Sequence, residues 1–196
     1  MPDRRYHHGD LRAALLARAE QTLREKGVDA LSLRELARDI GVSHAAPSRH
    51  FRDKRALLDA LALTGMNRLL AELERVGSAC DTFGARITAL ARTYVDFSVG
   101  EPELHDVMFA GKHDPDASEE MRAAAQRLGA LIFEVITEGQ RAGEIRPDDP
   151  ARIELLMFST LHGFAALAAS EVVPVSAGPG AVDAIVEDLM RGLRPR

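Results

Sequence analysis

Apolar residues recur every three or four positions along almost the whole chain, the spacing that gathers them on one face of an α-helix. Beyond Leu57 no segment resembles a strand, and glycine and proline residues interrupt the helical pattern at intervals. The chain is therefore expected to be all-α. The pattern predicts about nine helices, at residues 11–26, 32–40, 44–51, 54–76, 81–99, 102–110, 118–141, 150–170 and 181–193.

The residues that flank the first helices indicate a specific arrangement. Ser32 begins the second helix as an N-cap with Glu35 three residues later, which is the spacing of a capping box. A tight turn at Gly41 leads to a third helix, which Ser43 can cap and which has Pro47 in its first turn, where proline is tolerated best. Two short helices joined by such a turn form a helix-turn-helix.

The third helix carries side chains suited to reading bases in a major groove. Arg49 can hydrogen-bond to guanine edges, and the methyl groups of Ala45 and Ala46 can contact those of thymine. Ser32, Lys54 and the backbone N–H groups that open the second and fourth helices suit phosphates. The alternative is a three-helix bundle whose polar face meets only water.

Charge is divided unevenly along the chain. Residues 1–55 contain 12 Lys and Arg against 8 Asp and Glu, whereas the remaining residues contain 13 against 22. A basic first segment on an acidic body indicates that the first segment meets a polyanion. We therefore expect a DNA-binding domain at residues 1–55 and a second helical domain at residues 56–196.

Four short motifs resemble the DNA-binding segment of TetR-type transcriptional regulators. They are Tyr6-His7-His8-Gly9-Asp10-Leu11, Leu31-Ser32-Leu33-Arg34-Glu35-Leu36-Ala37, Gly41-Val42-Ser43 and Arg49-His50-Phe51-x-x-Lys54. The resemblance covers about residues 7–60 and implies that Ser43 to His50 form the recognition helix, with Phe51 packed inside. Ser48 stands where the family often has a tyrosine that contacts DNA. The expected DNA-binding residues are Ser32, Ser43, His44, Ala45, Ala46, Ser48, Arg49, His50 and Lys54.

The eighth predicted helix is apolar around most of its circumference. A helix of this kind must be buried on nearly all sides, and a chain of this size has little room for that, so a second subunit is the economical partner. The resemblance to TetR-type proteins implies that the eighth and ninth helices pair across a two-fold axis. The expected interface residues are Leu161, Phe164, Ile185 and Leu189. A two-fold dimer suits a palindromic operator.

Bulky apolar residues of the second domain predict a pocket for a small, mostly hydrophobic effector. The expected lining residues are Tyr94, Phe97, Met108, Phe109, Phe133, Met157 and His162. The alternative for each of them is an ordinary place in the core. The whole pattern favours a homodimeric, ligand-responsive regulator that acts as a repressor, without a cofactor.

Two other classes of function remain as alternatives. One is an architectural DNA-binding protein without an effector. The other is an all-helical, metal-dependent enzyme, since His105, Asp106, His113 and Asp114 lie near one another in the sequence, although their spacing is not that of a helical metal site.

Composition limits the compartment and the cross-links. The single cysteine, Cys80, excludes an intramolecular disulfide and any multi-cysteine zinc site. The first residues lack the apolar segment of a secretory signal, and the longest uncharged run is too short and too polar for a membrane span. A soluble cytoplasmic protein is expected.

Overall fold

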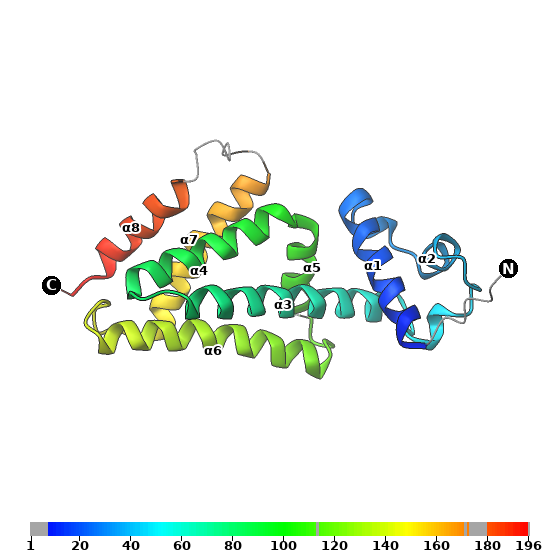
Figure 1. Ribbon diagram of the computed structural model, residues 1–196, viewed down its shortest axis with the longest axis horizontal. Coiled ribbons are helices and arrows are strands. Elements are labelled where there is room, and N and C mark those ends of the chain that lie inside the picture. Colours follow the sequence, from blue (N-terminus) through cyan, green and yellow to red (C-terminus); the bar gives the residue numbers. More distant parts are fainter. Residues whose placement is uncertain (1–7, 113, 171, 173–179, 196) are drawn as a thin grey trace. The chain divides into compact units, whose positions relative to one another are not determined.

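The computed structural model describes residues 8–112, 114–170, 172 and 180–195, and these residues contain helices but no strands, so the all-α prediction is confirmed (Figure 1). Eight α-helices and two short 3-10 helices account for the predicted elements. Most of the observed ends lie within a few residues of the expected ones. In chain order the elements are α1 (His8–Lys26), η1 (Val28–Ala30), α2 (Leu33–Asp39), η2 (Pro47–Arg49), α3 (Lys54–Ser78), α4 (Phe83–Gly100), α5 (Pro102–Lys112), α6 (Glu119–Arg141), α7 (Pro150–Ala169) and α8 (Ala181–Leu193).

The chain forms two compact units. The first comprises the residues up to Met66 together with Glu103–Arg122, and the second comprises Asn67–Pro102 with the residues from Ala123 onwards. Helices α3 and α6 therefore each contribute residues to both units. The division predicted at residue 55 separates a DNA-binding domain from an effector-binding and dimerisation domain. These are functional domains and not packing units, so the division stays a prediction.

The predicted third helix is not an α-helix. Residues 44–50 form turns around the single 3-10 turn η2, which begins at Pro47. The backbone N–H groups of Ala46, Arg49 and His50 each bond to the carbonyl three residues earlier, rather than four. Proline has no N–H and its ring clashes with the preceding turn, so Pro47 tightens the segment into a short 3-10 turn at the point where a longer helix was expected.

The predicted helix ends are confirmed at two places in the first unit. The Asp53 carboxylate accepts a hydrogen bond from the Ala56 N–H at 2.8 Å and caps α3. Gly41 has a φ of 74°, which lets the next N–H, that of Val42, bond to the Ala37 carbonyl at 2.9 Å beyond the end of α2. Ser32 is the N-cap residue of α2, but its side chain makes no capping hydrogen bond, so that part of the capping-box prediction is wrong.

The core of the first unit includes Leu15, Leu23, Leu36 and Phe51, each no more than 2% exposed. The buried position of Phe51 agrees with the role that the family resemblance implied. The guanidinium carbon of Arg12, on α1, lies over the Phe51 ring at 5.4 Å from its centroid. This packing holds the segment that follows η2 against α1.

In the second unit α4 packs against α7 and α8. A buried cluster of Ile136, Ile145, Ile153 and Leu193 joins α6, the loop after it, α7 and α8. The backbone N–H of Arg146 donates to the Leu193 carbonyl at 2.7 Å, which ties this loop to the end of α8. The α4–α7 contact brings two of the predicted effector residues together, as described below.

Close packing around Gly139 on α6 gives the first prediction. A Cβ atom there would lie 2.8 Å from Phe83 Cε2 and 3.0 Å from Ile145 Cδ1. Gly139→Ala is expected to lower the free energy of unfolding by about 1–3 kcal/mol, because overpacking outweighs the helix propensity that alanine adds. Urea unfolding followed by circular dichroism measures it.

Gly129→Ala, on the same helix, is the matched control, because a Cβ atom at Gly129 meets nothing within 4 Å. This variant is expected to gain about 0.5–1 kcal/mol of stability. Equal stabilisation of both variants would contradict the close contact at Gly139.

Candidate functional site

The turns around η2 present most of the predicted base-reading side chains to solvent. Ser43, His44, Ala45, Ser48 and Arg49 are exposed. The Arg49 side chain forms no ion pair with any residue that the structure describes, so its guanidinium is available to an external partner. An unpaired arginine on an exposed segment of a helix-turn-helix has the chemistry needed for a guanine edge.

Two of the predicted DNA-binding residues around η2 are less accessible, and the hydroxyl of a third, Ser48, is already engaged. Ala46 and His50 are half-buried, and the His50 Nε2 atom is buried without a hydrogen-bond partner among the described residues. The exposed hydroxyl of Ser48 already donates to the Ala45 carbonyl at 2.8 Å. Of the exposed side chains, Arg49 is therefore the one that offers several free donors.

The residues predicted to contact phosphates stand at helix beginnings. Ser32 precedes α2 and is half-buried, and Lys54 is the first residue of α3. The Lys54 ammonium donates to the Asp29 carbonyl at 3.4 Å, a long contact that leaves its other two hydrogens for a further acceptor. Arg52, which the sequence analysis did not select, is 75% exposed at its side chain and pairs only with Asp53, at 3.2 Å, among the described residues. The positive balance of the first 55 residues was the signal that could have identified it.

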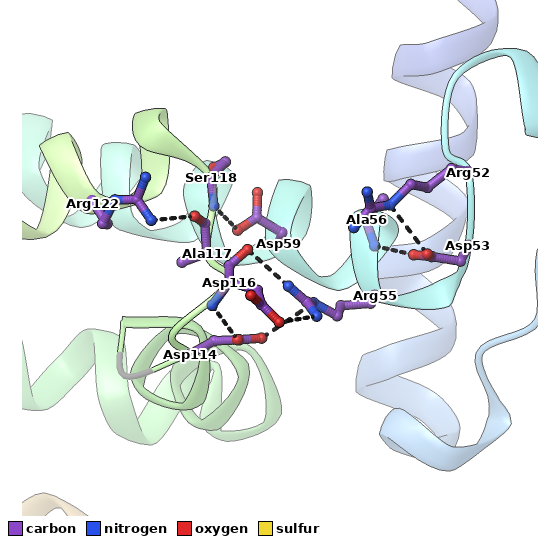
Figure 2. Close-up of polar contacts among 10 residues, drawn as sticks. All are labelled: Arg52, Asp53, Arg55, Ala56, Asp59, Asp114, Asp116, Ala117, Ser118 and Arg122. Carbon is purple, nitrogen blue, oxygen red and sulfur yellow. Dashed lines mark hydrogen bonds and ion pairs between the residues drawn. The ribbon is translucent and has the colours of Figure 1, made fainter.

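A polar network anchors the first turn of α3 to the loop between α5 and α6, within the first unit (Figure 2). Arg55 donates to the Asp116 carboxylate and to the Asp116 carbonyl, both at 2.8 Å, and its Nε atom lies 3.4 Å from the Asp114 carboxylate. The hydrogen bond to Asp116 and the nearby carboxylates raise the pKa of Arg55. The Asp59 carboxylate accepts from the Ser118 N–H at 3.0 Å. No sequence signal links these segments, which are about 60 residues apart.

Two predicted effector residues meet in the second unit. The Tyr94 hydroxyl of α4 lies 2.7 Å from Nδ1 of His162 on α7, within hydrogen-bond distance. The Phe158 ring stacks on the His162 ring at a centroid distance of 5.0 Å and lies 6.2 Å from the Tyr94 ring. Phe158 is thus a third member of this group, which the predicted set of lining residues did not include. The group combines aromatic surface with one polar pair.

The other predicted effector residues have separate surroundings. Phe97 is half-buried with the Arg68 guanidinium 5.5 Å from its ring centroid, and Met157 packs against the cluster around Ile153. Phe133 is 47% exposed. Met108 and Phe109 belong to the first compact unit, where Met108 is fully buried and Phe109 lies 4.5 Å from the His105 ring. A single effector pocket lined by all seven residues stays a prediction.

Burial raises the pKa of Tyr94 well above its ordinary value of 10.0, because the phenolate is poorly solvated there. We expect the native protein to keep Tyr94 neutral at a pH at which the unfolded chain ionises it. This contribution to stability is complete below pH 10.0 and is lost as the pH rises above that value.

Ultraviolet absorbance of the phenolate tests this in a Tyr6→Phe variant, because Tyr6 and Tyr94 are the only tyrosines. The native variant is expected to show no ionisation between about pH 10 and 11, whereas the same variant in guanidinium titrates near the ordinary value. A native midpoint equal to the unfolded one would mean that solvent reaches Tyr94.

The predicted dimer residues lie on α7 and α8, which still present apolar surface. Leu161, Phe164, Ile185 and Leu189 are half-buried. On α7 only Ile153, Ala165 and Ala168 are buried, whereas Leu155, Leu156 and Leu167 are 66%, 46% and 45% exposed. Apolar surface of this extent on one helix is typical of an interaction site.

The structure describes three of the four residues considered for metal chemistry, His105, Asp106 and Asp114. His105 Nδ1 lies 3.9 Å from the Asp106 carboxylate, and His113 is outside the described residues. Within the part of the chain that the structure describes, no three His, Cys, Asp or Glu residues are arranged to hold a metal ion. The same part contains no helix with the length and apolar character needed to cross a membrane.

Comparison with known proteins gives two family matches. Residues 15–61 match the model described as bacterial regulatory proteins, tetR family, and residues 87–193 match the tetracyclin repressor-like C-terminal domain. The chain is 28% identical over 148 residues to the HTH-type transcriptional repressor Rv1474c of Mycobacterium tuberculosis, which covers 75% of each chain. It is also 54% identical over 52 residues to the class A tetracycline repressor protein of transposon 1721 from Escherichia coli, which covers 26% of this chain and 22% of that protein.

Solved structures agree with these matches. A protein of unknown function from Rhodococcus sp. RHA1 has a TM-score of 0.89 and 47% identity, covering 98% of this chain and 100% of that one. A TetR family transcription regulator from Marinobacter aquaeolei VT8 has a TM-score of 0.75 and 18% identity, covering 94% and 96% of the two chains. Each of these proteins whose name states a function is a transcriptional regulator or repressor, and none is named as an enzyme.

Proposed function

Because the chain belongs to the TetR family and is a DNA-binding transcriptional regulator, we propose that it acts as a homodimeric repressor, which a small hydrophobic effector releases from a palindromic operator. Residues 1–55 would bind the operator, and residues 56–196 would hold the effector and the dimer interface. The observation that carries this proposal is the exposed segment around η2, where the Arg49 guanidinium lies among small side chains and forms no ion pair with any described residue.

The small size of the neighbouring side chains supports a close approach to DNA. Ala45 and Ala46 leave the backbone of the segment near the groove floor, where their methyl groups can meet thymine methyl groups. Ser32, directly before α2, and Lys54, the first residue of α3, would contact the phosphates on either side of the groove. Phosphate contacts would set the register of the protein, and Arg49 would supply sequence preference.

The exposed leucines of α7 support the dimer. Leu156 and Leu167 are eleven residues apart, so they lie on one face of the helix with Gly163 between them. A Cβ atom at Gly163 would meet nothing within 4 Å, so this face is open in the single chain. A partner's α7 would cover it, and the two-fold axis would place two DNA-binding segments about one helical turn of DNA apart, roughly 34 Å, or a multiple of that distance.

The group formed by Tyr94, Phe158 and His162 supports an effector site in the second unit. Its rings provide apolar surface, and the Tyr94–His162 hydrogen bond provides one polar contact that an effector could exchange for its own. The dimer would have one conformation whose DNA-binding segments match the operator and another in which their spacing is wrong for it. An effector that binds the second conformation more tightly would lower operator affinity by the ratio of its two affinities. The word repressor in the name of the M. tuberculosis relative supports the direction of regulation.

Selection of binding sites from a random duplex library with the purified protein tests the proposal. Washing at about 0.15 M salt removes most of the non-specific phosphate binding. One enriched palindrome is the expected result. Salt-sensitive binding without an enriched sequence would indicate an architectural protein instead, and enrichment of a single, non-repeated half-site would contradict the dimer.

A further inference from the structure

The first unit contains a hollow of about 340 Å³ that is separate from the Tyr94–His162 group of the second unit. The end of α1, the 3-10 turn η1, the first turns of α3 and one face of α5 surround it. Its volume is at the lower end of the range found for small-molecule sites. We call it the α5 pocket.

The walls of the α5 pocket are apolar. Leu23 of α1 forms the buried part, and Val28, Leu58 and Val107 form the more accessible part. Val28 is 39% exposed, although η1 is next to the core of the unit. These partly exposed valine and leucine side chains come from three different elements. A small apolar group bound among them would be removed from water, which is energetically favourable.

The rim of the α5 pocket is acidic. Its charged residues are Arg55 and four carboxylates, those of Asp59, Glu103, Asp106 and Asp114. The Arg55 guanidinium is already paired with Asp114 and Asp116, so it does not neutralise the other carboxylates (Figure 2). The rim therefore keeps a net negative charge.

Two of these carboxylates are available to a cation. Glu103 makes no ion pair with any described residue, and Asp106 is 88% exposed with only a 3.9 Å contact to His105. Their spacing of three residues on α5 places both on the face that also presents Val107. One helix face thus offers negative charge directly beside an apolar wall.

We propose that the α5 pocket binds a small organic ammonium ion with a compact apolar body. The body would displace water from Leu23, Val28 and Leu58, and the ammonium group would lie between the Glu103 and Asp106 carboxylates. A carboxylate of the same shape would be repelled by the rim, and a neutral alcohol would lack the charge-assisted bonds. This site goes beyond the proposed hydrophobic effector, because it uses other residues in the other compact unit.

Calorimetric titration of the full chain with 2-phenylethylamine at neutral pH tests the proposal, with 2-phenylethanol and 3-phenylpropanoate as probes of the same size. The amine is expected to bind with a Kd of about 1 mM or tighter, and at least about tenfold more tightly than the alcohol. A Glu103→Gln/Asp106→Asn double variant should weaken amine binding at least about tenfold. A Val107→Trp variant, which fills the pocket, should abolish it.

The Glu119→Gln/Glu120→Gln double variant is the matched control. It removes the same charge from exposed positions at the start of α6, in the same compact unit, and should bind the amine like the native chain. Thermal unfolding of each variant shows that it is folded. Equal affinity for amine and alcohol, no saturable amine binding, or amine binding that both the Glu103/Asp106 and the Val107 variants retain would each overturn the proposal. None of these results bears on operator selection, so the proposed regulator function is tested independently.

Discussion

An Arg49→Ala variant is expected to remain folded and dimeric while losing most of its preference for its operator. A bidentate arginine–guanine contact contributes about 1–3 kcal/mol of discrimination between bases. A two-fold dimer would make the contact twice, so the variant is expected to lose about 2–6 kcal/mol of discrimination. Arg49 is exposed and forms no ion pair with any described residue, so its removal leaves no buried partner unsatisfied. The measurement is an operator titration of the variant beside the native protein.

Lys54→Ala is the comparison that separates base reading from phosphate binding. Loss of a phosphate contact weakens binding about equally on all sequences and reduces the salt dependence, whereas loss of Arg49 changes which sequence is preferred. Arg141→Ala, at the carboxyl end of α6, should leave both properties unchanged. If Arg49→Ala binds the operator as tightly as the native chain, another residue of the 43–49 segment reads the bases.

Leu167→Glu is expected to dissociate the proposed dimer. Two-fold symmetry would introduce the carboxylate twice into an apolar interface, and an unpaired charge buried there costs several kcal/mol. A rise of at least about a thousandfold in the dimer dissociation constant is expected, as measured by sedimentation or by size exclusion with light scattering. The resulting monomer should also lose its high affinity for a palindrome.

Phe133→Glu is the matched control for the dimer prediction. Phe133 is a large apolar residue on α6 with 47% exposure, almost the same as the 45% of Leu167, but it lies outside the proposed interface. Leu167 is already exposed in the single chain, so a charge there has little effect on the fold of one subunit. An unchanged dimer in Leu167→Glu would move the interface away from this face of α7.

Local signals in the sequence predicted much of the fold. Proline at the first position of α7, aspartate before α3 and glycine after α2 each act within a few residues, and each predicted boundary was confirmed. The bounds of α8 agree with the predicted 181–193. The prediction of a third helix was wrong at the recognition segment. Proline is tolerated in the first turn of a helix, so Pro47 was compatible with that prediction, but the structure has only a single 3-10 turn there.

Contacts between distant segments could not be predicted in this way. Helical spacing shows that a face is apolar, but it does not identify the element that covers that face. Hence the spacing of Arg55, Asp114 and Asp116 gave no sign of their network, and Phe133 could not be recognised as exposed. Tyr94 and His162 were both predicted to line an effector pocket, but their direct contact was not predicted. The type of a residue shows that it could line a pocket and does not show which other residues it meets.

The close approach of α3 and α5 within the first unit limits how this regulator can be recombined with others. At Gly65 a Cβ atom would lie 2.6 Å from the Met108 sulfur and 3.1 Å from Leu104 Cγ, so glycine at this position permits the contact. A DNA-binding segment excised at residue 66 would keep Ala62 and Gly65 of α3 but lose the α5 residues that approach them closely. A functional chimaera with another regulator must therefore transplant two segments of the gene, the first 66 codons and the codons for 103–122, and not a single amino-terminal module.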